Sequence, residues 1–188
     1  MESTSAVTPL LHHWHIEARE YARQESRRGR RHAFEHLDPS RTALVVVDMV
    51  PFFLEEGSHA QGIVPNISLL ADALRAAGGT VVWVLPGAGE PSAVSDEFLG
   101  PEIARMFRAQ AARVRCGIDT VLITGTVANV CCESSARDAS TLGYRVVMVA
   151  DANAARRDQD LNATLHTVYR TFGDVRPTSE VLELIAGG

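Results

Sequence analysis

Short apolar runs, rich in β-branched residues, recur along the chain and predict buried strands. The first run covers residues 42–47, and further runs cover residues 80–85, 120–124 and 145–150. Strands that are apolar on both faces are typical of parallel sheets covered by helices on both sides. The pattern therefore predicts a central, mostly parallel sheet.

Segments with the apolar spacing of helices alternate with these strands. Residues 65–77, 130–142 and 158–172 have this spacing, and each segment stops at a glycine, which suits the position after a helix. A short strand near residues 174–176 and a last helix from Ser179 complete the pattern. The alternation predicts an α/β fold with three α/β/α layers around a sheet of about five to six strands.

The segment before the first strand has a weaker pattern. From Pro9 to about His36 the spacing of apolar residues predicts a helix, although the apolar stripe is thin. We therefore divide the chain into an N-terminal helical extension, residues 1–40, and an α/β domain, residues 41–188.

Composition and charge narrow the class of protein. A chain of 188 residues, 46% hydrophobic and 22% charged, fits one globular domain. The net charge of −5 argues against a nucleic-acid partner, and the apolar runs are too short to span a membrane. Three cysteines, two of them adjacent, are not a disulfide framework. We expect a cytoplasmic protein with a small-molecule substrate and no membrane partner.

Two residues at the ends of predicted strands could carry chemistry. Asp48 ends the first strand, and alone it would be interpreted as a turn-capping residue. Cys131 follows the strand 120–124 at the first turn of the next helix, where backbone N–H groups favour a thiolate, so we expect a lowered thiol pKa. Both residues should meet at the carboxyl edge of the sheet, as a nucleophile and its acid/base. Cys116 and Cys132 are interpreted as packing residues.

The sequence resembles the isochorismatase-like cysteine hydrolases, a family that includes nicotinamidases and N-carbamoylsarcosine amidohydrolases. The resemblance runs from residues 43–49 to residues 173–175 and is most specific over residues 125–139, where a glycine and a short turn precede a cysteine and an Ala-Arg-Asp-Ala helix. It implies the isochorismatase-like hydrolase fold for the α/β domain.

The resemblance also implies roles for individual residues. Cys131 matches the nucleophile and Asp48 matches the general acid/base. A cis peptide bond is implied between Thr126 and Val127, with the amides of Val127 and Cys131 as the oxyanion hole. Arg137 and Asp138 match an Arg-Asp pair that we interpret as structural, and Asp151 is interpreted as a turn organiser.

The pocket and the metal content are predicted less directly. Phe52, Phe53, Trp83, Thr126 and the loop 86–100 are candidate pocket walls, although Trp83 lies within a strand and could belong to the core. The Asp-x-His pair with which nicotinamidases bind metal does not follow Trp83, so we expect no metal and no cofactor. The presence of the cysteine favours cleavage of a carbon–nitrogen bond over the vinyl-ether cleavage of true isochorismatases.

One catalytic residue of the family has no counterpart, because all eighteen basic residues of the chain are arginines and none is a lysine. Three explanations stay open. Arg105 or Arg108 could replace the family lysine, activity could be lost, or a segment near Ala109 could be missing from the sequence. We expect a hydrolase that cleaves the C–N bond of a small amide, ureido or carbamoyl compound. The alternative is a catalytically impaired protein with a binding or assembly role. Family members commonly form homodimers or larger assemblies. The resemblance therefore implies the same here, with the N-terminal helical extension packed on a partner subunit.

Overall fold

A parallel sheet organises the part of the chain that the computed structural model describes, residues 8–85 and 117–188. Its strands follow the order β2-β1-β3-β4-β5, and every neighbouring pair is parallel. The five strands are β1 (Thr42–Val47), β2 (Thr80–Val84), β3 (Thr120–Thr126), β4 (Arg145–Ala154) and β5 (Asp174–Arg176). The predicted fold class, a parallel sheet in an α/β protein, is confirmed.

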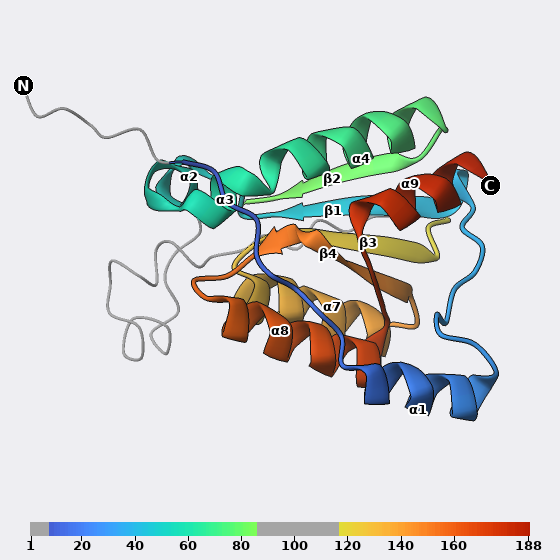
Figure 1. Ribbon diagram of the computed structural model, residues 1–188. Helices are drawn as coiled ribbons and strands as arrows, with labels where there is room; N and C mark the ends of the chain where they lie inside the picture. The colour runs from blue at the N-terminus through green and yellow to red at the C-terminus, as the bar shows by residue number, and fades with distance from the viewer. Residues whose placement is uncertain (1–7, 86–116) are drawn as a thin grey trace, which may run out of the picture.

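Helices cover both faces of this sheet (Figure 1). On one face lie α4 (Val64–Ala76) and α9 (Thr178–Ala186), and on the other lie α7 (Glu133–Thr141) and α8 (Asp158–Thr167). The alternation of strand side chains gives each face its own core, because neighbouring residues such as Val46 and Val47 belong to opposite clusters. Both faces of β1, β3, β4 and β5 are therefore largely buried, which explains why these strand sequences are mostly apolar, whereas the edge strand β2 is partly exposed.

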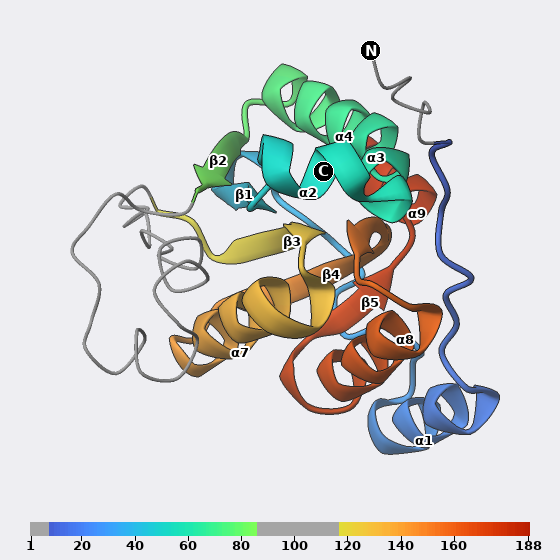
Figure 2. The same ribbon diagram turned by 90° about the vertical axis from the view of Figure 1, so that its left-hand side faces the viewer.

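Short helical segments lie at the ends of the strands. At the carboxyl edge, onto which Figure 2 looks, are α2 (Pro51–Glu56) and α3 (Ser58–Gly62), which follow β1. The others are η1 (Pro39–Arg41), η2 (Ala128–Cys132) and η3 (Val168–Phe172), of which the last two are single π-helical segments. Residues after β1 and after β3 thus meet at one edge of the sheet.

A close approach between β1 and β3 shapes this edge. Gly125 pairs with Val47 and has a φ of 116°, in the region that favours glycine. A Cβ atom at position 125 would lie 2.1 Å from the carbonyl oxygen of Val47. Only glycine can therefore bring the end of β3 this near to the residue that precedes Asp48.

The N-terminal segment differs from its prediction. Only α1 (Ala18–Arg28) is helical, and it ends at Gly29 with a left-handed φ of 77°. The helix predicted from Pro9 to about His36 is therefore wrong over residues 9–17 and 29–36. Residues 8–17 run irregularly beside α3 and α8 (Figure 2). The reason is tertiary: the Leu10 amide donates to the carbonyl of Ser58 at 3.0 Å instead of to its own segment. The division of the chain at residue 40 stays a prediction.

The fourth strand is longer than its apolar run predicts, since β4 continues to Ala154. Its pairing with β3 shifts register between Ile123 and Gly125. The buried Asn153 amide bridges the irregularity by donating to the carbonyls of Ile123 at 2.8 Å and Val149 at 2.7 Å. Polar side chains can thus continue a strand beyond the point where hydrophobicity alone would end it. None of the described helices is long and apolar enough to cross a membrane.

Candidate active site

Asp48 is held firmly at the carboxyl end of β1. Its amide donates to the carbonyl of Val84 in β2 at 2.8 Å, and its carbonyl accepts the Thr126 hydroxyl of β3 at 2.8 Å. The residue has a φ of 48°, which non-glycine residues seldom adopt, and only 2% of its surface is exposed. Both neighbouring strands therefore fix the backbone from which the carboxylate projects.

Cys131 lies in η2, between the end of β3 and the start of α7. The amides of Val130 and Cys132 both donate to the carbonyl of Val127, at 3.0 and 3.3 Å, so the turn closes tightly around the cysteine. Its side chain is half-buried and is in hydrogen-bonding contact with the Asp48 carboxylate. The structure thus brings together the two residues that sequence analysis paired across more than eighty positions.

The thiol is strongly held in its neutral form. Burial raises the pKa of Cys131 to about 12, and the hydrogen bond to Asp48 and the charge of that carboxylate act in the same direction. The backbone N–H groups of Val127 and Cys131 oppose this rise, since they favour the thiolate. The expectation of a lowered thiol pKa is therefore wrong for the resting state, because burial and the carboxylate outweigh the turn amides.

The pKa of the Asp48 carboxyl group is also raised. Burial raises the pKa of Asp48, and the hydrogen bond from the Cys131 thiol offsets part of that rise. Its Oδ1 atom is buried and has no hydrogen-bond partner among residues 8–85 and 117–188. An ionised carboxylate oxygen without a donor is costly to bury. Asp48 is consequently a stronger base than a solvated aspartate.

Two backbone donors lie beside the sulfur. The peptide bond between Thr126 and Val127 is cis, as the family resemblance implies. The N–H groups of Val127 and Cys131 both act on the Cys131 sulfur. A carbonyl carbon bonded to that sulfur would bring its oxygen to the same donors, the arrangement that stabilises an oxyanion.

The four candidate pocket walls lie in different environments. Phe52 is 59% exposed and packs edge to face on the half-buried Phe53, with ring centroids 5.1 Å apart. Trp83 is 49% exposed on β2, so it does not belong to the core. Thr126 is buried and its hydroxyl is bonded to Asp48, so it positions the carboxylate.

Of the other residues singled out in the sequence, Cys132 packs in the core and the rest lie outside the described part of the chain. Cys132 is fully buried, with its sulfur 4.0 Å from the carbonyl oxygen of Thr124. Arg105, Arg108, Ala109, Cys116 and the loop 86–100 lie outside the described residues.

Two acidic residues near the site have structural partners. Glu133 accepts Arg137 at 2.6 Å and the Thr164 hydroxyl at 2.6 Å, which ties α7 to α8. Arg137 thus pairs with Glu133, one turn earlier in α7. Asp151 accepts the Thr178 amide at 2.7 Å and its hydroxyl at 2.8 Å, and so fixes the start of α9.

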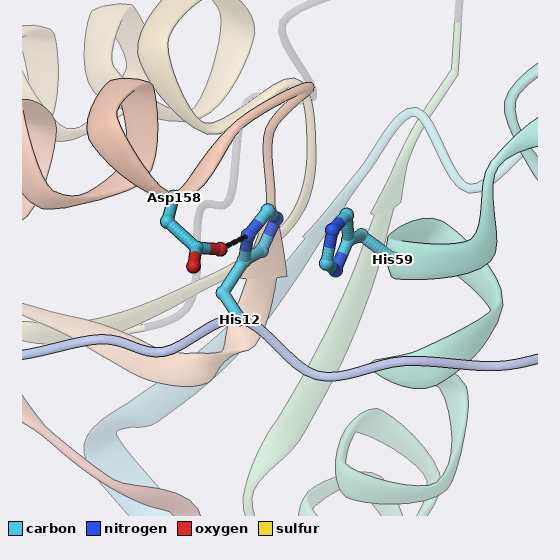
Figure 3. Close-up of side chains that lie close together, drawn as sticks. All are labelled: His12, His59 and Asp158. Carbon is cyan, nitrogen blue, oxygen red and sulfur yellow. Dashed lines mark hydrogen bonds and ion pairs between the residues drawn. The ribbon is translucent and has the colours of Figure 1, made fainter.

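Sequence reasoning missed a second group of polar side chains, formed by His12, His59 and Asp158 (Figure 3). His12 and Asp158 are hydrogen-bonded across 146 positions of the sequence. His12 lies in the segment whose helix prediction is wrong, so the sequence carried no signal that would place it there.

Comparisons with known proteins identify relatives of this chain. Residues 96–180 match the isochorismatase domain family. The chain is 29% identical to the uncharacterized isochorismatase family protein YwoC of Bacillus subtilis, over 80% of this chain and 97% of that protein. It is 28% identical to the ureidoacrylate amidohydrolase RutB of Agrobacterium fabrum, over 80% of this chain and 92% of that protein.

A structural relative agrees with these matches. A cysteine hydrolase from Pseudomonas syringae pv. phaseolicola superimposes with a TM-score of 0.69 and 25% identity, over 83% of this chain and 97% of that one. The alignment with YwoC runs over 185 positions but uses 80% of this 188-residue chain, so YwoC has residues at positions where this chain has none.

Proposed function

We propose that this chain is an isochorismatase-family hydrolase that cleaves the carbon–nitrogen bond of a small amide, ureido or carbamoyl compound through Cys131, as its similarity to members of that family supports. The observation that carries the proposal is the contact between the Cys131 thiol and the buried Asp48 carboxylate, beside the amides of Val127 and Cys131. A nucleophile, a base and an anion site are the parts that acyl transfer requires.

In the first half of the reaction, the sulfur attacks the carbonyl carbon while its proton passes to Asp48. The raised pKa of Asp48 favours this transfer, because a buried carboxylate gains by becoming neutral. The carbonyl electrons move to the oxygen, which accepts hydrogen bonds from Val127 and Cys131. When the tetrahedral intermediate collapses, Asp48 returns the proton to the nitrogen, and ammonia or an amine leaves.

In the second half, water attacks the resulting thioester. Asp48 accepts a proton from that water, the same two amides hold the second oxyanion, and the C–S bond breaks. The proton on Asp48 then restores the thiol. One water is consumed for each C–N bond cleaved, and Cys131 and Asp48 end in their starting states.

The open oxygen of Asp48 favours a nitrogen leaving group. Its Oδ1 atom lacks a donor among the described residues, and an amide or ureido N–H would supply one. An ester has no such hydrogen. The name of RutB, a ureidoacrylate amidohydrolase, supports a substrate of this kind. We therefore place small amides and ureides above esters.

A second candidate is a catalytically impaired member of the family with a binding or assembly role. The observation that favours it is the neutral thiol: the pKa of Cys131 is about 12, and among the described residues no cationic side chain contributes to it. The chain has no lysine that could supply a positive charge next to the thiol. That Arg105 or Arg108 supplies this charge stays a prediction. A homodimeric or larger assembly also stays a prediction.

The experiment that separates these functions measures ammonia release from ureidoacrylate, N-carbamoylsarcosine and nicotinamide. Wild-type protein is compared with Cys131→Ser, and Cys132→Ala is the matched control because Cys132 faces the core. Hydrolysis by the wild type and the control, with a loss of at least about 1,000-fold in Cys131→Ser, supports the enzyme.

Trapping the intermediate sharpens this test. Acid-quenched wild-type protein should carry the acyl or carbamoyl group on the peptide that contains Cys131, as measured by mass spectrometry. If wild-type protein hydrolyses none of the compounds and forms no adduct, the impaired alternative is favoured. If Cys131→Ser retains full activity, the proposed mechanism is wrong.

A further inference from the structure

The group of His12, His59 and Asp158 joins three segments that are far apart in the sequence (Figure 3). The His12 ring lies 3.6 Å from the His59 ring, centroid to centroid, with an interplanar angle of 14°. Its Nδ1 atom is 2.6 Å from Oδ1 of Asp158. His12 is buried, so these contacts exclude water from the junction.

This group has the composition of a metal site, but its geometry is different. A metal ion binds an imidazole nitrogen in the plane of the ring at about 2.0–2.1 Å. Two nearly parallel rings at stacking distance have planes that do not meet within that range. Nε2 of His12 is also engaged, since it accepts the Ala155 amide at 3.1 Å. The arrangement therefore joins protein segments.

Residues 8–17, which we call the N-terminal strap, are bonded to α3. The Leu10 amide donates to the carbonyl of Ser58 at 3.0 Å, and the Leu10 carbonyl lies 3.2 Å from Nδ1 of His59. At Gly62, a Cβ atom would lie 2.0 Å from the Leu10 carbonyl oxygen. The strap can cross α3 at this distance only because position 62 is glycine.

The same strap is bonded to α8. His12 contacts Asp158, and further along the strap the His15 amide donates to Oδ1 of Asn162 at 2.8 Å. The Asn162 side chain donates in turn to the His13 carbonyl at 3.0 Å. The strap thus spans from α3 to α8 along one side of the molecule (Figure 2).

What the strap holds is the segment that follows Asp48. The Gln61 side chain of α3 donates to the carbonyl of Leu54 in α2 at 2.6 Å. Helix α2 carries Phe52 and Phe53, the candidate pocket walls. A series of contacts therefore runs from His12 through His59 and α3 to the backbone of α2, the helix that carries these rings.

We infer that His12 is a positioning residue, which stacks on His59 and so fixes the α2–α3 wall of the substrate pocket against α8. The inference rests on the proposed function, because α2 and α3 matter for catalysis only if the pocket lies beside Asp48. His12 acts through the strap and does not touch the reacting atoms.

Hydrogen exchange tests the strap without any substrate. His12→Ala should speed amide exchange in residues 51–62 at least tenfold and leave α4 unchanged, whereas His13→Ala, on the same strap but exposed, should behave as wild type. His59→Phe keeps a ring to stack on and should stay near wild type, and His59→Ala is a milder second disruption if His12→Ala fails to fold. Unchanged protection of residues 51–62 in both alanine variants would overturn the inference.

Kinetics then separates positioning from general destabilisation. With whichever compound the wild type hydrolyses, His12→Ala should raise KM about tenfold and change kcat by less than twofold, and His12→Asn, which keeps a donor near Asp158, should recover part of the loss. A fall in kcat at unchanged KM would contradict a wall-positioning role. If no compound is hydrolysed by the wild type, the proposed function fails while the exchange result still decides on the strap.

A third experiment, thermal unfolding with added zinc chloride, tests whether the three side chains form a metal site instead. The wild type should show no zinc-dependent gain in Tm at micromolar concentration. A gain of several degrees that disappears in both His12→Ala and His59→Ala would identify a metal site and overturn the inference.

Discussion

Two buried carboxylates, Asp48 and Asp174, occupy opposite situations in this fold. Asp174 is 0% exposed and accepts the amides of Ala33 at 3.0 Å and Val175 at 3.1 Å, while His32 contacts it at 3.0 Å. Asp48 is 2% exposed, contacts a thiol, and leaves Oδ1 without a partner among the described residues.

Under the proposed function, this difference separates a structural carboxylate, Asp174, from a reactive one, Asp48. The partners of Asp174 come from the N-terminal segment and from β5, so its carboxylate joins these two segments through hydrogen bonds and ion pairs. Within the described residues, Oδ1 of Asp48 has no donor, and burial raises the pKa of this carboxyl group. A buried acid with unsatisfied oxygen is available to take and return a proton, whereas a saturated one is not.

The largest predicted effect comes from removing the Asp48 charge. Asp48→Asn should lower kcat by roughly 100- to 10,000-fold, because an amide cannot accept the thiol proton. Its free energy of unfolding should stay near or above the wild-type value, since a buried unpaired charge is removed. Steady-state kinetics and urea unfolding of the same preparation check both parts. Full activity in Asp48→Asn would contradict the assigned role.

The matching change at Asp174 should have the opposite outcome. Asp174→Ala removes the acceptor of the Ala33 and Phe34 amides and the ion-pair partner of Arg176, and should cost roughly 3–5 kcal/mol of unfolding free energy. Activity per folded molecule should change little. Urea unfolding measures the loss, and a stability equal to wild type would remove the basis of the comparison.

A smaller effect is expected at Thr126, which holds the Asp48 carbonyl. Thr126→Val keeps the shape but loses one buried hydrogen bond, and should cost about 1 kcal/mol of stability. We expect a modest fall in kcat as Asp48 loosens, and recovery in Thr126→Ser, which keeps the hydroxyl. Equal kcat values in wild type and Thr126→Val would show that this bond does not position the carboxylate.

The sequence predicted the architecture well, because continuously apolar β-branched runs are typical of parallel strands. It also predicted the meeting of Asp48 with Cys131, because carboxyl ends of parallel strands share an edge. The thiol pKa was not predictable, since it depends on burial and on the carboxylate at close range.

The N-terminal region shows a second limit of prediction from the sequence. Residues 8–17 have a helical pattern, but contacts with α3 and α8 replace the hydrogen bonds of a helix. His12 lies next to His59 and Asp158 because of those contacts. Contacts between segments this far apart in the sequence cannot be predicted from a local sequence pattern.

The most direct test of the Cys131–Asp48 pair is the pH dependence of Cys131 alkylation by iodoacetamide, localised by peptide mass spectrometry. Because the thiolate is the reactive form and the pKa is raised to about 12, the wild-type rate should keep rising through pH ~10 without a plateau. Asp48→Asn should lower that pKa and speed alkylation at pH ~9 by about tenfold, since the carboxylate charge no longer disfavours the thiolate. A wild-type rate that levels off below pH ~8, or a profile that Asp48→Asn leaves unchanged, would contradict the pairing of these two side chains.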